Sequence, residues 1–392
     1  MYRNTYVKID NNKLKENIKE IKNKYNSYKY YIGVVKANAY GHGDYIVNDL
    51  IASGINYLAV SSLEEALSIR KYNKEIAILC LEPINIKYLN IILDNNITIT
   101  VDSLKYTKEL IKEKNLNNLK VHIKLDTGMN RLGMKNREEV DEVVELLNDN
   151  KIYIEGIYTH FSTSGVNDVY YEKALDKFKE LTTNIDLSKI EIVHLDRSIT
   201  LVHHNKIPFA TGVRLGIIMY GFNQSIKSPT GIRKIKRNIL NKINKVKPPI
   251  LENDLELKTA FALYTEVMEV KKVYKGEIVG YGSSYIAKKD MYVAILPIGY
   301  IDKSVPFVKY VAINNKRYPV IGEICMDMTI VEVDSSIKVG DKVELFGDTI
   351  KIKEVSQSTN SNAYHILTSV GVRVPRVYSD GMEINYGKEN QL

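Results

Sequence analysis

Along the first 220 residues or so, short apolar runs alternate with longer segments of helical periodicity. Eight apolar runs have the composition of buried strands, at residues 30–37, 56–62, 76–81, 97–103, 120–126, 154–162, 190–196 and 213–221. Segments with apolar residues at helical spacing lie between most of them, for example residues 63–72, 137–150 and 170–184. Strands that alternate with helices form parallel sheets, and eight such units predict a (β/α)8 barrel.

The pattern changes after about residue 255. Strand candidates there are short and separated by turn residues, as at residues 277–282, 291–300, 310–322, 329–334 and 342–347. Asn314 and Asn315 suggest a hairpin turn within one of these segments. We therefore predict an α/β protein with a TIM-type barrel over residues 1–230 and a C-terminal all-β domain over residues 255–392.

A basic segment lies between the two predicted domains. Residues 232–247, IRKIKRNILNKINKVK, carry seven Lys/Arg and no acid, which is nearly all of the net charge of +8. Isoleucines recur at helical spacing in it, so a basic amphipathic helix is predicted within a linker at residues 231–254. Such a helix can lie on an anionic surface. The commoner arrangement, which we expect here, is an ordinary packed helix with a solvated basic face.

Composition limits the cellular setting. The only two cysteines, Cys80 and Cys325, are far apart and lack a Cys/His ligand spacing, so neither a disulfide framework nor a metal site is indicated. A reducing, cytoplasmic location fits. No stretch approaches the ~20 consecutive apolar residues of a membrane helix, so no membrane span is expected. Because the excess positive charge is local, we also expect no nucleic-acid partner.

Polar residues end several of the apolar runs. They are Lys36 near the end of the first run and Tyr40 after it, Lys124 in the fifth and Arg131 after it, His160 in the sixth, Ser198 after the seventh and Arg214 in the eighth. Each has a simpler explanation, such as a surface lysine, a structural histidine or a helix-capping serine. In a (β/α)8 barrel, however, all of these positions share one end, where active sites lie. Because like charges repel and buried charges are costly when unpaired, so many cations at one end of the barrel indicate that an anion binds among them.

A phosphorylated aldehyde would satisfy this predicted site. The loops after strands seven and eight of such barrels commonly bind phosphate, and here they offer the Ser198 hydroxyl and the backbone N–H groups of Gly216 and Ile217. A lysine whose pKa is lowered by neighbouring cations forms Schiff bases with aldehydes. Pyridoxal 5′-phosphate (PLP) combines both features, whereas no nucleotide-binding glycine motif follows a strand.

Six motifs together resemble the PLP-dependent alanine racemases of fold type III. They are VVKANAYGHG from residue 34, KLDTGMNRLG from 124, VRLGIIMYG from 213, GYGSSY from 280, LPIGYID from 296 and GEICMD from 322. Their order and spacing match the family from about residue 6 to residue 378. The resemblance implies a barrel followed by a β-domain, and a homodimer in which the partner's β-domain completes each active site.

The resemblance also implies an activity, the interconversion of L-alanine and D-alanine by two-base proton transfer on a PLP aldimine. Lys36 then holds PLP and acts as one base, and Tyr281 from the other subunit is the second. Arg214 faces the pyridine nitrogen, which leaves the ring a weak electron sink. His160 links this arginine to the catalytic tyrosine.

Further binding roles follow from the same resemblance. Tyr40, Ser198, Gly216 and Ile217 match the family's phosphate ligands. Arg131 and the backbone of Met326 match the groups that orient the substrate carboxylate and the cofactor's phenolic oxygen. Tyr300 matches a residue that lines the narrow access channel, and Lys124 matches a lysine that is carbamylated in many relatives.

Some positions depart from the family pattern. Asp196, Arg197, Ser198 and Ile199 stand where relatives usually have Ala-Asn-Ser-Ala, and Val372 stands where some members have a pocket tyrosine. Two alternatives therefore stay open: a racemase of the same fold that acts on serine or a larger amino acid, and, more distantly, a non-catalytic PLP-binding protein. D-alanine for a bacterial cell wall and alanine catabolism would use the same chemistry.

Overall fold

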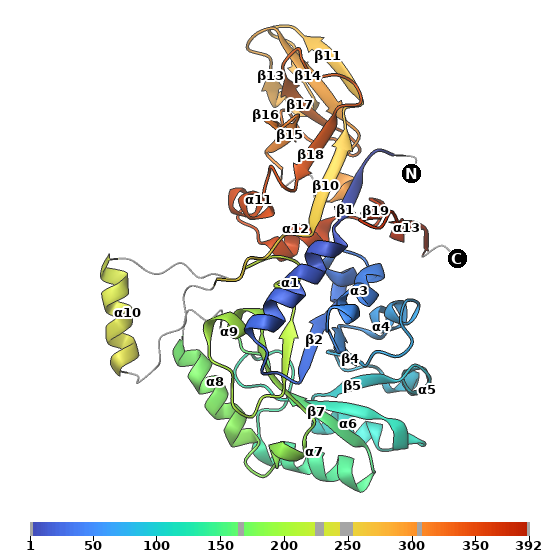
Figure 1. The fold of residues 1–392 in the computed structure, drawn as a ribbon, viewed down its shortest axis with the longest axis vertical. Coiled ribbons are helices and arrows are strands. Elements are labelled where there is room, and N and C mark those ends of the chain that lie inside the picture. Colours follow the sequence, from blue (N-terminus) through green and yellow to red (C-terminus); the bar gives the residue numbers. More distant parts are fainter. Residues whose placement is uncertain (1–2, 164–167, 224–230, 244–253, 304–307, 390–392) are drawn as a thin grey trace. The chain divides into compact units, whose positions relative to one another are not determined.

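The chain divides into two compact units (Figure 1). The computed structural model describes residues 3–163, 168–223, 231–243, 254–303 and 308–389. One unit, the barrel unit, contains Lys15–Ala37 and Val47–Leu257, and the other, the β unit, contains Met1–Leu14, Asn38–Ile46 and Lys258–Leu392. The domain limits 1–230, 231–254 and 255–392 stay a prediction, and residues 244–253 of the expected linker lie outside the described residues.

The barrel unit contains the eight-stranded parallel barrel that the apolar runs predict. Its strands follow chain order around the barrel and close where Tyr30 pairs with Gly212. They are β2 (Tyr30–Val34), β3 (Tyr57–Val60), β4 (Ile78–Cys80), β5 (Ile97–Val101), β6 (Lys120–Lys124), β7 (Tyr153–Tyr158), β8 (Ile192–Arg197) and β9 (Gly212–Leu215). All residues of β3, β4, β5 and β9 are buried, as expected for parallel strands covered on both faces.

Helices follow most of the barrel strands. They are α3 (Val47–Ala52), α4 (Leu63–Arg70), α5 (Leu89–Asp94), α6 (Leu104–Leu110), α7 (Arg137–Asp149), α8 (Asp168–Leu181) and α9 (Ser198–His203), with α1 (Asn11–Lys24) ahead of β2. α7 illustrates why they form. The Asn136 side chain caps its first turn by accepting from the backbone N–H of Glu138, and Val140, Val143 and Leu147 form its buried face.

The β unit is built on a seven-stranded sheet in the order β16-β15-β18-β10-β1-β19-β20. Its strands are β1 (Tyr6–Ile9), β10 (Phe261–Glu266), β15 (Tyr310–Ile313), β16 (Lys316–Pro319), β18 (Lys342–Phe346), β19 (Arg376–Tyr378) and β20 (Glu383–Ile384). β1 comes from the beginning of the chain and pairs antiparallel with β10 and parallel with β19. The hairpin turn predicted at Asn314 and Asn315 is confirmed, since the two residues, both with positive φ, join β15 to β16.

Two smaller sheets complete the strands of the β unit. One has the order β11 (Glu269–Val273), β14 (Met291–Leu296) and β17 (Thr329–Val333), and the other pairs β12 (Ile278–Val279) with β13 (Tyr285–Ile286). A buried cluster that includes Val273, Met291 and Val293 fills the space beside them. The predicted fold class is thus confirmed. Three short helices that the strand pattern does not predict, α11 (Ile352–Ser358), α12 (Ala363–Ser369) and α13 (Tyr386–Glu389), accompany the strands.

The basic segment forms the predicted helix, α10 (Gly231–Ile243). Its isoleucines Ile232, Ile235, Ile239 and Ile243 are all exposed. The expectation of an ordinary packed helix is therefore wrong, because the apolar face is not buried against the described part of the chain. Among the described helices, none is long and apolar enough to cross a membrane.

Candidate active site

Lys36 lies two residues after the end of β2, at the end of the barrel where all the parallel strands finish. Its side chain is half-buried. The four residues after it have φ between +50° and +53°, so α2 (Lys36–Tyr40) is a left-handed turn. None of the four is glycine, and each costs about 1–2 kcal/mol in this conformation. Glu65 holds the turn by accepting from the Ala37 N–H at 2.7 Å. Strain of this kind marks functional segments.

Arg214 projects from β9 and is almost completely buried. Its Nη1 donates to the His194 carbonyl at 2.6 Å, and its Nη2 donates to the carbonyls of Thr159 and Leu195 at 2.8 and 2.9 Å. Burial lowers the pKa of the guanidinium to about 10, which leaves it protonated at neutral pH. Carbonyl oxygens fix its orientation without neutralising its charge, so the site keeps a buried cation in a defined direction.

A chain of hydrogen bonds leads from Arg214 into the barrel interior. A guanidinium can only donate, so His194 Nδ1 accepts from Arg214 Nη1 at 2.8 Å, and His194 carries its proton on Nε2. That Nε2 lies 2.9 Å from His122 Nδ1, and His122 Nε2 lies 3.2 Å from Glu155 Oε2. Burial lowers the pKa of both imidazoles, which are therefore neutral. All hydrogen bonds in this series therefore donate in the same direction, from the Arg214 guanidinium toward the Glu155 carboxylate.

The motif comparison overlooked His122, His194 and Glu155. The available signal was their place inside otherwise apolar strands, KVHIK and IVHLD for the histidines. A polar residue in the middle of a barrel strand whose neighbours are all buried must point either at a helix or into the barrel. A buried polar side chain of this kind needs a hydrogen-bond partner to offset the free-energy cost of its burial, and the sequence does not show which residue that partner is.

Lys124 is the last residue of β6 and is buried. Its Nζ donates to the Leu125 carbonyl at 2.9 Å and lies 5.0 Å from the centre of the Tyr158 ring. Burial, followed by the charges of Arg214 and Arg131, lowers its pKa to about 7, although Asp126 opposes the shift. A large fraction of this amine is neutral at physiological pH, which is the form that reacts with a carbonyl carbon. Arg131 itself lies in the loop after β6 and is exposed.

His160 follows β7 and lies within the electrostatic reach of the same cations. Burial, and then the charges of Arg214, Arg197 and Arg131, lower its pKa to about 2. The imidazole is therefore neutral at any working pH. The shifts at Lys124 and His160 have a common cause besides burial, an excess of positive charge at this end of the barrel. Lys124, Arg131, His160 and Arg214 therefore act on one another electrostatically at this end of the barrel.

The loops after β8 and β9 meet at Ser198. Its Oγ accepts from the Gly216 N–H at 2.9 Å, and Ser198 is buried. Ile217 is also fully buried, and no described residue accepts from its N–H. Buried backbone N–H groups are nearly always paired, so this donor fits an acceptor supplied by a ligand. These groups suit an anion such as phosphate.

Tyr40 ends the left-handed turn and is grouped with the β unit. It is buried, and its ring lies 5.7 Å from that of Tyr364. Tyr40 thus ends the strained turn that begins at Lys36, and its side chain is packed rather than exposed.

Tyr281, Met326 and Tyr300 also belong to the β unit, and all three are exposed. The exposed fractions are 70% for Tyr281, 52% for Met326 and 47% for Tyr300. Tyr281 begins the short helix η5 (Tyr281–Ser283), and no described residue bonds its hydroxyl. Such a phenol is accessible to another molecule.

The Tyr300 and Met326 loops are joined through their backbones. The N–H groups of Tyr300 and Ile301 donate to the carbonyls of Cys325 and Met326 at 3.0 and 3.1 Å. Gly299 permits this approach, because a Cβ there would lie only 2.2 Å from the Met326 carbonyl oxygen. The glycine of the PIGYID motif is therefore explained by the neighbouring ICMD loop.

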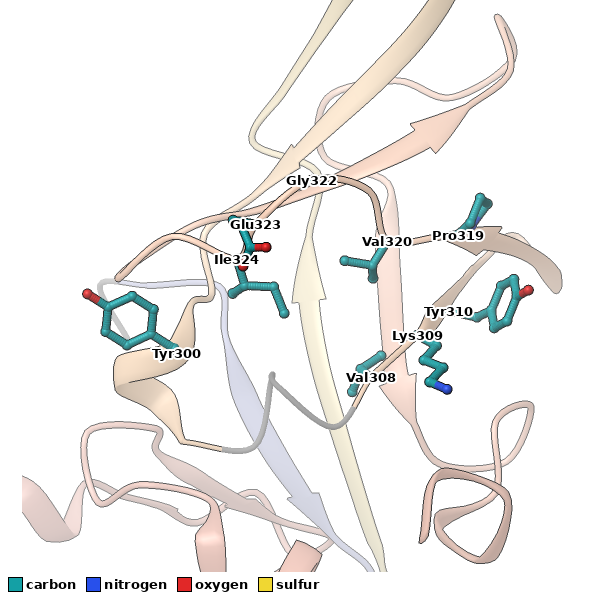
Figure 2. A pocket seen from close by; sticks show the side chains of 9 residues that line it. All are labelled: Tyr300, Val308, Lys309, Tyr310, Pro319, Val320, Gly322, Glu323 and Ile324. Carbon is teal, nitrogen blue, oxygen red and sulfur yellow. The ribbon is translucent and has the colours of Figure 1, made fainter. Parts of the chain in front are cut away.

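A shallow groove of about 620 Å³ lies in the β unit beside Tyr300. Figure 2 shows Tyr300 at one end of it, Glu323 and Ile324 in the middle, and Tyr310 and Pro319 at the other end. Tyr300 is the only predicted site residue among the residues that line it. All residues that line the groove belong to the β unit.

The two charged residues that depart from the family pattern have different surroundings. Asp196 is buried and accepts from the Tyr28 hydroxyl at 2.9 Å, and burial raises its pKa. Arg197 Nη2 donates to the Thr163 carbonyl at 2.7 Å and its Nε to the Phe161 carbonyl at 3.3 Å. Arg197 therefore holds the segment after His160, and its charge adds to the positive field there.

The barrel-end cluster fits PLP. Lys36 offers an amine, and the cations that lower the pKa of Lys124 and His160 call for an anion. The Ile217 N–H, which no described residue accepts from, is a donor that suits a phosphate. A doubly charged phosphate would compensate for the charges of Arg214, Arg197 and Arg131, which lower the pKa of His160.

Comparisons with known proteins identify the family of this chain. Residues 9–224 match the family described as alanine racemase, N-terminal domain, and residues 260–378 match alanine racemase, C-terminal domain. Alanine racemase 1 of Bacillus subtilis (strain 168) is 32% identical over 392 residues, covering 98% of this chain and 95% of the relative.

Solved structures extend the comparison. A crystal structure of alanine racemase from Bacillus anthracis with bound L-Ala-P has a TM-score of 0.86 and 29% identity, and covers 99% of each chain. A histidine racemase from Leuconostoc mesenteroides subsp. sake has a TM-score of 0.82 and 25% identity, covering 96% of this chain and 98% of that one. The fold thus occurs with more than one amino acid substrate.

Proposed function

Because this chain belongs to the alanine racemase family, we propose that it interconverts L-alanine and D-alanine with PLP as its cofactor. The observation that carries the proposal is the family match over both parts of the chain, together with Lys36 at the barrel end at which the buried Lys124 and Arg214 also lie. The protein is an enzyme, an amino-acid racemase.

Racemisation requires two proton-transfer groups on opposite sides of the substrate. When bound, PLP joins the substrate amine and withdraws electrons from Cα, which makes the α-hydrogen acidic. We assign Lys36 to one face and Tyr281, supplied by the partner subunit, to the other. One group removes the proton from Cα and the other returns a proton to the opposite face. A single base would return the proton to the face from which it came.

Arg214 faces the pyridine nitrogen in this proposal. A guanidinium with a pKa of about 10 keeps its own proton at neutral pH, so it does not protonate that nitrogen. Arg214 would thereby leave the ring a weak electron acceptor, which limits side reactions. His194 accepts a hydrogen bond from Arg214. Because His194 is neutral, it does not neutralise the positive charge of Arg214.

The other residues bind and orient. Ser198, Gly216, Ile217 and Tyr40 hold the phosphate. Arg131 and the Met326 backbone orient the substrate carboxylate and the phenolic oxygen of the cofactor, His160 links Arg214 to Tyr281, and Tyr300 narrows the access channel. These assignments rest on the family motifs and on the cationic environment described above.

Lys124 is proposed to be carbamylated. Its neutral amine attacks the carbon of CO2, so a C–N bond forms as one C=O bond opens to a carboxylate, and the amine releases a proton to solvent. The carbamate then places a negative charge within the electrostatic reach of Arg131. Intact-protein mass spectrometry at neutral pH, with and without bicarbonate, tests this. The mass of one CO2 should be gained in wild type and not in Lys124→Met; equal masses under both conditions would refute the modification.

We further propose a cytoplasmic homodimer that supplies D-alanine for a bacterial cell wall. The exposed Tyr281, Met326 and Tyr300 suit an interface at which one subunit completes the site of the other. Cys80 and Cys325 are both free, in keeping with a reducing compartment.

The test is exchange of the α-proton. Purified protein with PLP is incubated in D2O with L-alanine, and with L-serine, L-lysine or L-histidine in parallel, and chiral chromatography with mass detection follows inversion and deuterium uptake. Alanine should invert fastest. Faster inversion of another amino acid would retain the racemase and change its substrate, an outcome that the similar histidine racemase makes worth testing.

Two variants assign the bases. Lys36→Ala should abolish exchange, and Tyr281→Phe should abolish inversion while leaving residual deuterium uptake through Lys36. Tyr274→Phe, another exposed tyrosine of the β unit, is the matched control and should retain full activity. No exchange with any substrate would favour a PLP carrier, and inversion at an unchanged rate in Tyr281→Phe would remove that residue from the mechanism.

A further inference from the structure

Helix α10 is not accounted for by the racemase chemistry. It spans Gly231–Ile243, whereas the two family matches cover residues 9–224 and 260–378. The helix therefore lies in a part of the chain that neither family domain includes. None of its residues is among the proposed catalytic or binding groups.

The helix carries an apolar stripe that is open to solvent. Ile232, Ile235, Ile239 and Ile243 are spaced by three or four residues, so they share one face. Their exposed fractions are 84%, 60%, 54% and 69%. A run of four large exposed apolar side chains indicates an interaction site.

Helix α7 provides the comparison within the same chain. It also has 13 residues and an apolar stripe, yet Val140, Val143 and Leu147 on that stripe are buried. Equal periodicity thus has opposite outcomes in the two helices. The apolar stripe of α7 faces the barrel core. The isoleucines of α10 are not covered by the described part of the protein, so their burial requires an apolar surface outside it.

The positive charge of α10 indicates which apolar surface this is. Its sequence, GIRKIKRNILNKI, contains five Lys/Arg and no acidic residue. Lys236 and Lys242 are exposed beside the isoleucines. Basic residues close to an anionic lipid surface are attracted to it. A nucleic acid would use the charge alone and leave the isoleucines in water, and the helix has no aromatic side chain for base stacking.

We propose that α10 binds the surface of bilayers that contain anionic phospholipids and thereby holds the enzyme at the membrane. The isoleucine face enters the boundary between headgroups and acyl chains, and the basic residues contact the phosphates. A helix of 13 residues is about 20 Å long, shorter than the ~30 Å hydrocarbon core, so it lies in the plane of the surface and binds reversibly.

The direct test is vesicle flotation of the full-length holoenzyme. Vesicles of phosphatidylcholine alone are compared with vesicles in which about a third of the lipid is phosphatidylglycerol, at low and high salt. The bound fraction should be at least about tenfold larger on the anionic vesicles at low salt and should fall steeply as salt is added. Equal recovery on both vesicle types would overturn the proposal.

Variants separate the two components of binding. Lys236→Glu with Lys242→Glu, and Ile235→Asp with Ile239→Asp, should each reduce vesicle binding about tenfold or more. The matched control, Lys112→Glu with Lys114→Glu, makes the same charge change at exposed positions elsewhere and should bind as wild type does. Racemase activity without vesicles should be unchanged in all three, because these residues lie outside the proposed active site.

Specific results would contradict the proposal. A large loss of thermal stability in Ile235→Asp with Ile239→Asp would mean that the stripe packs against the protein. Binding to a random-sequence DNA duplex that outcompetes anionic vesicles, and that only the lysine variants weaken, would indicate a nucleic-acid surface instead.

Discussion

Single buried charges determine how the barrel interior responds to pH and to mutation. Lys124 and Glu155 illustrate the two cases, a charged form that folding disfavours and a charged form that folding favours. The pKa of the Lys124 amine falls to about 7, mainly through burial, so its charged form is disfavoured in the folded protein. The pKa of the Glu155 carboxyl falls to about 2, because hydrogen bonds from His122 and Tyr57 outweigh the opposing effect of burial, so its charged form is favoured.

Lys124 makes the folded protein less stable at low pH. Below about pH 7 the amine is protonated in both the folded and the unfolded state, and the cost of the buried charge is fully present. Between about 7 and 10.5 only the unfolded state binds the proton, so stability rises with pH. Lys124→Met should therefore be more stable than wild type by about 2–4 kcal/mol at pH 6, with an advantage that disappears near pH 10.

The measurement is urea unfolding of PLP-free protein in CO2-depleted buffer across this pH range. Lys112→Met, an exposed substitution of the same kind, serves as the control. If the advantage of Lys124→Met were constant with pH, the shift in the Lys124 pKa would not be its source.

Glu155 should have the opposite pH dependence. Its carboxylate accepts from the Tyr57 and Thr98 hydroxyls at 2.5 and 3.1 Å and from His122 at 3.2 Å. Glu155→Gln removes the charge that these donors face and should cost about 2–4 kcal/mol at pH 7. The stabilising effect of a lowered carboxyl pKa is present above 4.5 and is lost as pH falls toward 2, so the difference should narrow there.

Glu191→Gln is the matched control for this experiment. Glu191 accepts from the hydroxyls of Tyr30 and Tyr153, but it is exposed. Its substitution should cost less than about 1 kcal/mol, because exposed pairs contribute little. Comparable losses in the two variants, measured by urea unfolding, would show that burial is not what makes the Glu155 network strong.

At the scale of elements, the barrel strands were predictable and the left-handed turn was not. Strands β3, β4, β5 and β9 are buried throughout, and such strands require continuous apolar runs that can be read from the sequence. The sign of φ has no comparable signal in the turn, because alanine, asparagine and tyrosine normally adopt negative φ. Only the contacts of the folded protein hold those residues at positive φ.

The same distinction applies to the candidate site. Strand-end residues such as Lys36, Lys124 and Arg214 could be located from the βα repeat, since parallel strands end together. The histidine chain could not, because its hydrogen bonds join β6, β7, β8 and β9, and the partners are known only once the barrel closes. The exposure of the α10 isoleucines likewise depends on what the helix contacts.

The strain in the turn can be tested with one substitution. Ala37 is exposed and has a φ of +53°, so Ala37→Gly loses little burial while it removes the cost of a Cβ in this conformation. After allowance for the greater freedom of glycine in the unfolded chain, we expect a gain of about 0.5 kcal/mol. Ala52→Gly, at an exposed position in α3, should be neutral or destabilising. A loss of stability in Ala37→Gly beyond that of the control would mean that the turn is not strained.

At the scale of the whole molecule, the proposed active site combines residues of two subunits. Lys36 belongs to the barrel unit, and Tyr281 is exposed on the β unit. If each site takes its lysine from one subunit and its tyrosine from the other, two inactive variants can complement each other. In a heterodimer of Lys36→Ala and Tyr281→Phe, one site lacks both residues and the other retains both.

Co-expression of the two variants with different tags tests this prediction. Random pairing makes about half of the dimers mixed, so inversion activity should recover to about a quarter of wild type. Tandem purification of the mixed dimer should raise this to about half. If both residues of a site came from one chain, no mixed dimer would regain activity.

Strand β1 also has a consequence for how the protein is made. It contains residues Tyr6–Ile9, and its partners in the sheet are β10 (Phe261–Glu266) and β19 (Arg376–Tyr378). During translation at about 5–20 residues per second, β1 leaves the ribosome tens of seconds before its last partner is synthesised. The barrel strands, all encoded between these two points, can pair first. β1 thus becomes one of the last strands to be incorporated into its sheet, and it needs protection from aggregation until then.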